Sequence, residues 1–373
     1  MNRRAWLKAA AAGIPVAALS ACATRNAKVA APAGYRGERK FARVKVSPDR
    51  VIRTVAGLRP YRPSGFVVRT QKLDNKIVVH NYGHGGGGIT LCWGTAHLAM
   101  EQAIETGHKE FAVIGSGAVG LATARLLQRR GFAVTIYAKD LPPATTSNIA
   151  GGQWSPYSVF DPDKTSPAFM EQFGRAARLA NRYYQDMVGD YYGVHWIENY
   201  VLSDQPPRNG GGAPFGLDGL FPESRLLEKS EHPFAVPYVR RFTTMLIEPP
   251  VYLNAVMRDF LLAGGKIVVR EFAALEGFLA LPEPVIMNCT GLGAEALLKD
   301  EDLTPIKGQL TILLPQPEVD YITLGPSDIY MFPRRDGILL GGTHEEGVWT
   351  LEPDREAAER IMQGHMKVFH EMG

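Results

Sequence analysis

Residues 111–120 read Phe-Ala-Val-Ile-Gly-Ser-Gly-Ala-Val-Gly, and this stretch decides the fold class. A short apolar run leads straight into a G-x-G-x-x-G fingerprint, residues 121–130 then show helical spacing, and residues 132–137 form a second apolar run. In this setting the first glycine permits a tight turn, the second lets the backbone approach a pyrophosphate, and the third allows close packing of helix on strand. We therefore expect a parallel sheet that binds a dinucleotide, with contacts from Gly115, Gly117, Ala118, Val119 and Gly120.

The composition is that of a globular protein. The chain has 373 residues, of which 45% are hydrophobic and 21% charged, enough for two domains or one large core with a lobe. A net charge of +3 is too small to indicate nucleic-acid binding. Cys92 and Cys289 are isolated from each other, so we expect two buried thiols, and no metal site is predicted.

The first residues resemble a bacterial twin-arginine export signal. Arg3 and Arg4 precede a weakly apolar stretch that is too short to span a bilayer. Leu-Ser-Ala-Cys at residues 19–22 matches the lipobox, in which Cys22 becomes lipidated; the alternative is an ordinary cleaved signal with an incidental cysteine. We expect residues 1–22 to be the signal, residues 23–42 a tether, and the protein to face the periplasm of the bacterial cell envelope.

A second glycine run precedes the fingerprint. Residues 80–90 read His-Asn-Tyr-Gly-His-Gly-Gly-Gly-Gly-Ile-Thr. This run resembles the C-terminal flavin-contacting motif of the D-amino-acid oxidase family, whose members normally begin with the fingerprint and end with this motif. Each motif occurs once, so duplication does not explain the order. The resemblance implies a circularly permuted member of that family over residues 43–373.

The resemblance also implies FAD as the cofactor. The glycine turn and the helix that follows would face the flavin and stabilise negative charge on its reduced form, through Gly85, Gly86, Gly87, Gly88, Ile89 and Thr90. Residues 145–154 resemble the family stretch around the pyrophosphate, and residues 285–291 resemble a strand whose end touches the cofactor. Further contacts are then expected from Thr145, Thr146, Ser147, Gly151, Gly152, Gln153, Thr290 and Gly291.

The usual ribose-binding acid is replaced. Lys139 stands where the family normally carries that acid, and Asp140 follows it. Either Asp140 makes a shifted ribose contact or it is an exposed turn charge.

Residues 58–63, Leu-Arg-Pro-Tyr-Arg-Pro, resemble the family's Arg-Pro-x-Arg-Pro motif. By that resemblance Arg62 binds the substrate α-carboxylate in a bidentate fashion, the Gly86 carbonyl accepts from the substrate amine, and Arg59 is structural. Tyr330 matches the tyrosine that hydrogen-bonds the carboxylate, with a core aromatic as the alternative.

Three further side chains have predicted roles. Asp336-Gly337 predicts a hairpin turn that follows Tyr330. On this hairpin, Arg334 either faces the pocket, where it would favour an acidic substrate side chain, or is a solvated charge. His84 is interpreted as a turn residue that bonds to backbone.

The expected fold class is α/β: a Rossmann-like parallel-sheet FAD domain, about residues 72–160 and 245–300, interleaved with a mostly antiparallel substrate domain, about residues 43–71, 161–244 and 301–373. The implied activity is oxidation of a D-amino acid, by hydride transfer to flavin N5, to an imino acid that hydrolyses to a 2-oxo acid and ammonia. Dioxygen would be the acceptor, giving hydrogen peroxide. The alternatives are a lipid-anchored dehydrogenase that uses a membrane quinone, a glycine or sarcosine oxidase relative, a flavin protein that binds amino acids without turnover, and an NAD-dependent reductase.

Overall fold

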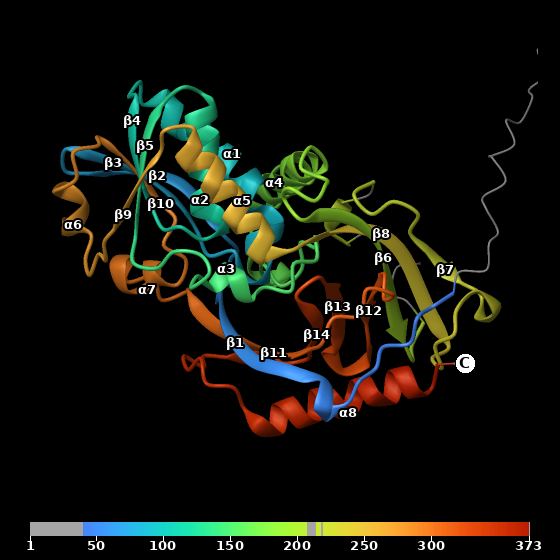
Figure 1. Ribbon diagram of the computed structural model, residues 1–373. Coiled ribbons are helices and arrows are strands. Elements are labelled where there is room, and N and C mark those ends of the chain that lie inside the picture. Colours follow the sequence, from blue (N-terminus) through green and yellow to red (C-terminus); the bar gives the residue numbers. More distant parts are fainter. Residues whose placement is uncertain (1–39, 207–213, 218, 373) are drawn as a thin grey trace, which may run out of the picture. The chain divides into compact units, whose positions relative to one another are not determined.

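The apolar run after residue 109 forms β4 (Glu110–Ile114), a central strand of a six-stranded sheet in the order β2-β3-β10-β4-β5-β9 (Figure 1). We describe a computed structural model, which covers residues 40–206, 214–217 and 219–372. The predicted signal, with Cys22, and most of the tether lie outside the described residues. The strands of this sheet are β2 (Val67–Leu73), β3 (Lys76–Tyr82), β10 (Val285–Asn288), β4, β5 (Ala133–Ala138) and β9 (Lys266–Val269).

All neighbouring pairs of this sheet are parallel except β2–β3. Its four inner strands, β3, β10, β4 and β5, are mostly buried, and the alternation of their side chains divides them between two layers. Val79 and Val113 pack under the long helices, whereas Val78 and Ala112 pack on the opposite face. The first layer contains α1 (Gly88–Glu105), α2 (Ala118–Arg129), α4 (Pro167–Gln185) and α5 (Pro249–Leu262), and the second contains α6 (Glu276–Leu279) and α7 (Gly293–Leu298).

A second sheet has the order β1-β11-β14-β13-β12-β6-β8-β7, with β15 paired to β11. Its pairs are antiparallel except β12–β6, so the expected mostly antiparallel sheet is confirmed. The strands are β1 (Val51–Tyr61), β6 (Val194–Ser203), β7 (Arg225–Leu227), β8 (Tyr238–Ile247), β11 (Thr304–Leu313), β12 (Tyr321–Leu324), β13 (Tyr330–Arg334), β14 (Gly337–Gly341) and β15 (Glu345–Glu346).

Helix α8 (Arg355–His370) runs beneath this second sheet (Figure 1). Its N-cap is Asp354, whose carboxylate accepts from the Ala357 N–H, and its buried Ile361 and Phe369 join the core under the sheet. Phe41, at the edge of the predicted tether, packs edge-to-face on Tyr200 of this core, with 5.1 Å between ring centroids.

Short elements complete the chain. The β13–β14 connection is the predicted hairpin, with Gly337 at φ +148°. No helix in the described part of the chain is long and apolar enough to cross a membrane. The short helices are α3 (Thr146–Ile149), η1 (Pro48–Arg50), η2 (Gly85–Gly87), η3 (Pro162–Lys164), η5 (Pro214–Gly216), η6 (Lys229–Glu231) and η7 (Pro326–Asp328).

The predicted glycine motifs meet at one edge of the parallel sheet. Strands β3, β4, β5 and β10 all run to that edge, so the segments that follow them converge there. Helix α1 leaves the glycine turn after β3 and ends only a few residues before β4 begins. The chain therefore passes from one motif to the other through a single helix.

Candidate functional site

A cavity of about 1320 Å³ lies where the carboxyl edge of the parallel sheet meets the antiparallel sheet. It exceeds the several hundred Å³ of an ordinary small-molecule pocket, so it has room for a dinucleotide and a substrate together. Two kinds of wall enclose it. The wall on the parallel-sheet side, which we call the backbone wall, consists of glycine-rich segments, and the wall on the antiparallel sheet, which we call the side-chain wall, consists of long side chains.

In the fingerprint, Gly115 and Gly120 have the conformation and packing that were predicted for them. Gly115 adopts φ +112°, and a Cβ there would lie 2.4 Å from the Cys289 carbonyl oxygen. A Cβ on Gly120 would lie 2.0 Å from the Gly115 carbonyl oxygen, so the helix packs directly on the turn. Gly117 is the N-cap of α2, and nothing but the Ser147 hydroxyl lies near its added Cβ, at 3.1 Å. The helix N-terminus therefore opens onto the cavity, as an anionic pyrophosphate requires.

The segment from Thr145 to Gln153 lies between the two sheets. The Ile247 N–H donates to the Gly152 carbonyl at 2.7 Å, and a Cβ on Gly152 would lie 1.9 Å from the Ile247 carbonyl oxygen. Gln153 donates to the Asn199 side chain at 2.7 Å, which joins the segment to β6. A Cβ on Gly151 would lie 2.3 Å from the Phe332 ring. The glycines here allow the chain to pass between two packed walls.

The glycine turn after β3 is held from behind. The Gly86 N–H donates to the Ser158 carbonyl at 2.8 Å, and Gly86 itself is exposed on the cavity. Thr90 donates to the Ser155 carbonyl at 3.0 Å and accepts from the Ser155 N–H at 3.2 Å, so its hydroxyl fixes a neighbouring loop. Gly87 faces Val159 and does not line the cavity.

Most of the predicted cofactor residues line the same cavity. It is lined by Gly85, Gly86, Gly88, Ile89, Thr90, Gly115, Gly117, Ala118, Val119, Asp140, Thr145, Thr146, Ser147, Gly151, Gly152, Gln153, Thr290 and Gly291. The exceptions are Gly87 and Gly120, which lie behind the surface that the others form, and their buried positions follow from the packing given above.

The adenosine end of the cavity has an altered charge pattern. Lys139 forms an ion pair with Glu271 at 3.6 Å, both side chains being largely exposed. The Asp140 main-chain carbonyl accepts from the Ser116 hydroxyl at 2.6 Å, which fixes the turn after β5. Asp140 therefore holds this turn through its backbone, while a ribose contact through its carboxylate stays a prediction.

Arg59 and Tyr330 meet on the side-chain wall. An Arg59 Nη2 donates to the Tyr330 hydroxyl at 3.4 Å, and the Tyr330 ring stacks on Phe332 with 5.0 Å between centroids. Glycines on neighbouring strands make room for both: a Cβ on Gly308 would lie 2.4 Å from Arg59 Nη2, and one on Gly341 would lie 2.1 Å from the Tyr330 ring. The pair presents a guanidinium and a phenol to the cavity, the donors that a carboxylate needs.

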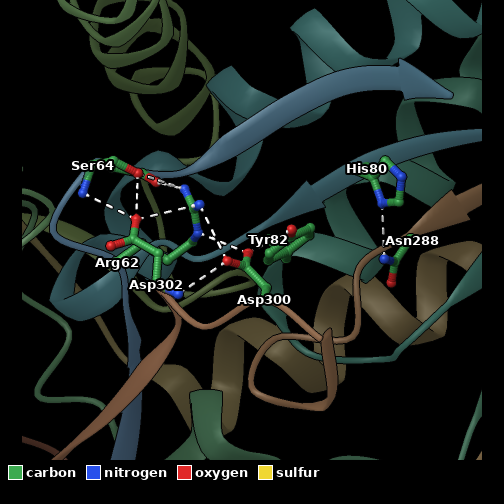
Figure 2. A network of polar contacts seen from close by, with 8 residues as sticks. Arg62, Ser64, His80, Tyr82, Asn288, Asp300 and Asp302 are labelled. Carbon is green, nitrogen blue, oxygen red and sulfur yellow. Dashed lines mark hydrogen bonds and ion pairs between the residues drawn. The ribbon is translucent and has the colours of Figure 1, made fainter. Parts of the chain in front are cut away.

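The structure corrects the position of Arg62. Arg62 does not line this cavity, and its guanidinium belongs to a network at the end of β1 (Figure 2). Arg62 Nε donates to Asp300 at 2.9 Å, Nη2 pairs with Asp302 at 3.3 Å, and Nη1 donates to Ser64 at 2.9 Å. Since Arg59 and Arg62 are three residues apart, they fall on opposite sides of the extended chain, and only one can face the cavity.

The Arg62 network is a structural support. Tyr82 donates to Asp300 at 2.7 Å. Burial opposes the charge of Asp300, but the hydrogen bonds from Tyr82 and Arg62 and the charge of Arg62 outweigh it and lower its pKa. A Cβ on Gly83 would lie 2.5 Å from the Arg62 side chain, so the network packs against the start of the glycine turn. His80 and Asn288, 3.1 Å apart, brace the neighbouring strand ends (Figure 2).

Two further predictions need correction. Arg334 is neither in the pocket nor solvated: it is buried, pairs with Asp336 at 2.6 Å, and donates to the Ala150 carbonyl at 2.9 Å. His84 bonds a side chain where backbone was expected, with Nε2 2.8 Å from the Thr95 hydroxyl. Burial lowers the pKa of His84 to about 3, so the imidazole is neutral at physiological pH.

The sequence interpretation missed several side chains of this wall. Arg240 and Phe242 of β8, Val201 of β6 and Leu324 of β12 all line the cavity. Cys92 and Cys289 are buried free thiols, as predicted. Among the described residues, no group of three or more His, Cys, Asp or Glu side chains is placed to hold a metal ion.

Comparisons with known proteins agree with this geometry. A profile of the family described as FAD dependent oxidoreductase (DAO) matches residues 110–372. The chain is 31% identical to a D-amino-acid oxidase of Rubrobacter xylanophilus over 67% of this chain and 74% of that protein. It is also 31% identical to a human D-aspartate oxidase over 67% of this chain and 73% of that protein.

Solved structures show the same fold. Glycine oxidase from Geobacillus kaustophilus superposes with a TM-score of 0.52 at 16% identity, over 71% of this chain and 80% of that one. The glycine cradles, which added Cβ atoms would fill, and the open helix N-terminus fit FAD. With the match over most of its length, the chain belongs to the DAO family of FAD-dependent oxidoreductases.

Proposed function

We propose that the protein oxidises a D-amino acid to the imino acid, which water then hydrolyses to a 2-oxo acid and ammonia. The observation that carries this proposal is the Arg59–Tyr330 pair, which lines the same cavity as the backbone wall. The names of its relatives, D-amino-acid oxidase and D-aspartate oxidase, support the substrate class. FAD, when bound, supplies a two-electron acceptor.

The protein's own residues position the substrate. Arg59 and Tyr330 bind the α-carboxylate, which places the Cα hydrogen toward the backbone wall. The carbonyl of Gly86, an exposed residue that lines the cavity, accepts a hydrogen bond from the amine. With the carboxylate, the amine and the Cα hydrogen all directed, three of the four groups on Cα are fixed and the hand of the amino acid is selected. The substrate loses a hydride from Cα and a proton from its nitrogen. The hydride carries the two electrons of the oxidation, and the loss of the proton leaves a neutral imine.

Arg59 is a better ligand than Arg62 for the substrate carboxylate because Arg62 already has acidic partners. The Arg62 guanidinium already pairs with Asp300 and Asp302, and a substrate carboxylate would have to displace them. The bonds of Arg59 within the described residues are long, at 3.4 Å to Tyr330 and 3.5 Å to the Thr343 carbonyl. A carboxylate can replace such bonds with shorter, charge-assisted ones.

A spectrum tests the reaction. The purified chain should retain a flavin chromophore, which D-amino acids but not L-amino acids should bleach in the absence of oxygen. Readmitted air should restore the colour with one equivalent of hydrogen peroxide, whereas recovery only with a quinone would indicate a dehydrogenase. A flavin that no amino acid bleaches would overturn the proposal and leave a binding protein.

We infer further that the domain is circularly permuted. The family profile begins at residue 110, yet Arg59 and the glycine turn at residues 83–90 precede it and line the same cavity as the fingerprint. A chain in which residues 43–106 follow residue 372 through a flexible linker should fold and retain FAD. If such a chain, tried with several linker lengths, bound no flavin, the inference would fail.

We also propose an envelope location through lipidated Cys22, which rests on the signal motif alone. Expression in a bacterium with labelled palmitate should label the wild-type protein, and Cys22→Ala should abolish both the label and membrane fractionation. An unlabelled, freely released wild-type protein would contradict this proposal.

A further inference from the structure

Four cavity-lining residues stand in one row across the side-chain wall. Tyr330 of β13 is the register partner of Leu324 in β12, Leu324 is the partner of Val201 in β6, and Val201 is the partner of Arg240 in β8. All four line the cavity, so they project from the same face of the sheet. The row begins at Tyr330, one member of the proposed carboxylate-binding pair, and ends at Arg240.

The length of the row separates its two polar ends. Neighbouring strands lie about 4.8 Å apart, so three steps put about 14 Å between the backbones of Tyr330 and Arg240. Between them the floor is apolar, formed by Val201 and Leu324. One carboxylate cannot contact both ends of the row. A molecule with two acid groups joined by methylenes, together with the reach of the Tyr330 and Arg240 side chains, can connect them.

The Arg240 side chain follows the cavity wall. Its guanidinium carbon lies 5.1 Å from the centroid of the Phe242 ring, which is two residues along the same face of β8 and also lines the cavity. Contact with the ring favours this placement of the guanidinium. The neighbouring Arg241 projects from the other face, where it pairs with Glu198 and Glu223 at 3.0 Å each.

The charges around the row favour an anion. Besides Arg59 and Arg240, the titratable groups lining this half of the cavity are His344 and Asp328. Burial, with the nearby Arg59, lowers the pKa of His344, which is therefore neutral at physiological pH. Asp328 is exposed. Two guanidinium groups and one exposed carboxylate thus line this half of the cavity.

We propose that Arg240 determines specificity by binding a carboxylate at the end of the substrate side chain. The preferred substrate class is then a D-amino acid of glutamate length or longer, with D-glutamate favoured over D-glutamine, D-aspartate and D-alanine. The apolar floor between Tyr330 and Arg240 contacts the methylenes, which is why the shorter acid fits less well. This inference rests on the proposed D-amino-acid oxidation.

Ligand binding tests the inference without turnover. Glutarate and butyrate differ by a second carboxylate, and calorimetry on the FAD-loaded protein should show glutarate bound at least 30-fold more tightly. Arg240→Leu should remove that ratio, while Arg240→Lys should keep part of it. Arg241→Leu, which removes the adjacent arginine on the other face, should leave the ratio unchanged.

Turnover provides the second measurement. For D-glutamate, kcat/KM should fall at least 30-fold in Arg240→Leu, while kcat/KM for D-alanine stays within threefold. A wild-type ratio near one for glutarate over butyrate, or an unchanged ratio in Arg240→Leu, would overturn the inference. If the Arg240 inference failed in this way, reduction of the wild-type flavin by D-alanine would still support the proposed oxidation. If no D-amino acid reduced the flavin, the proposed oxidation itself would be wrong.

Discussion

The two walls of the cavity work by different physical means. On the backbone wall, the fingerprint, the glycine turn and the 145–153 segment bring main-chain atoms to the cofactor, and added Cβ atoms would meet backbone at about 2 Å in several places. On the side-chain wall, Arg59, Tyr330 and Arg240 reach from strands into the cavity. We therefore expect the backbone wall to be sensitive to added side-chain atoms. We expect the side-chain wall to be sensitive to removal of its guanidinium and phenol groups.

The largest effect is expected from a glycine of the backbone wall. Gly152→Ala places a Cβ 1.9 Å from the Ile247 carbonyl oxygen at φ +94°, so the loop must move and FAD should be lost. Gly131 is the matched control, because it has φ +83° and nothing within 4 Å of an added Cβ. Gly131→Ala should cost about 1–2 kcal/mol and keep the flavin.

Flavin absorbance per protein and urea unfolding measure both changes. If Gly152→Ala retained FAD with a free energy of unfolding equal to that of Gly131→Ala, the distinction between the walls would not hold.

Removal of the carboxylate-binding arginine should affect catalysis alone. Arg59→Leu should lower kcat/KM by about 10²–10³-fold, mostly through KM, because a charge-assisted hydrogen-bonded contact with substrate is lost. FAD content should be unchanged, since the hydrogen bonds of Arg59 go to Tyr330 and to the Thr343 carbonyl and not to the glycine segments of the backbone wall. Steady-state kinetics with equal flavin loading provides the measurement, and an unchanged KM would contradict the assignment.

Arg62 should behave in the opposite way. Arg62→Leu leaves Asp300 without its ion-pair partner in a largely buried site, which should lower the free energy of unfolding by about 3 kcal/mol. The KM of the remaining folded enzyme should change less than threefold. Urea titration checks the first expectation, and Arg62→Leu/Asp300→Asn should recover part of the loss. A large rise in KM with wild-type stability would restore Arg62 as the substrate ligand.

The pH dependence of stability should involve His84. Unfolded, its imidazole binds a proton below about pH 6.5; folded, burial lowers its pKa to about 3. The unfolded state thus binds more protons between these values, and stability falls as the pH falls through that window. From pH 6.5 to 5 the contribution of His84 is about 2 kcal/mol.

His84→Gln should remove that share of the acid sensitivity. His80 and His365, whose pKa values burial lowers to about 4, should still contribute theirs. Urea unfolding at pH 7.5 and pH 5 measures the change, and an identical pH dependence in the variant and the wild type would show that His84 is protonated in the folded protein.

The smallest effect is expected at the phenol of the side-chain wall. Tyr330→Phe keeps the ring on Phe332 and removes one hydrogen bond, so kcat/KM should fall about tenfold. Stability should change little. A wild-type kcat/KM would leave Tyr330 as a packing residue.

The sequence predicted the backbone wall better than the side-chain wall, for a physical reason. The roles of Gly115 and Gly120 depend on local turn and helix geometry, which neighbouring residues determine. The choice between Arg59 and Arg62 depends on which face of β1 meets the cavity, and cross-strand register decides that. Arg240 and Arg241 pose the same problem, since adjacent residues of a strand always face opposite ways.

Arg334 shows a second limit. Its place on the hairpin that follows Tyr330 allowed it to face the pocket, but the tight turn brings Asp336 back to pair with it. The buried position of the Arg334 side chain also depends on a hydrogen bond to the Ala150 carbonyl, 184 positions away in sequence. No local pattern signals such a partner.

The most direct test follows the reduction of bound flavin in the absence of oxygen, with D- and L-amino acids, in the wild-type protein and in Arg59→Leu and Arg62→Leu. We predict saturable reduction of the wild type by D-isomers only, a half-saturating concentration at least 100-fold higher in Arg59→Leu, and a nearly unchanged one in Arg62→Leu. Reduction by L-isomers, no reduction at all, or a loss of affinity confined to Arg62→Leu would contradict the account.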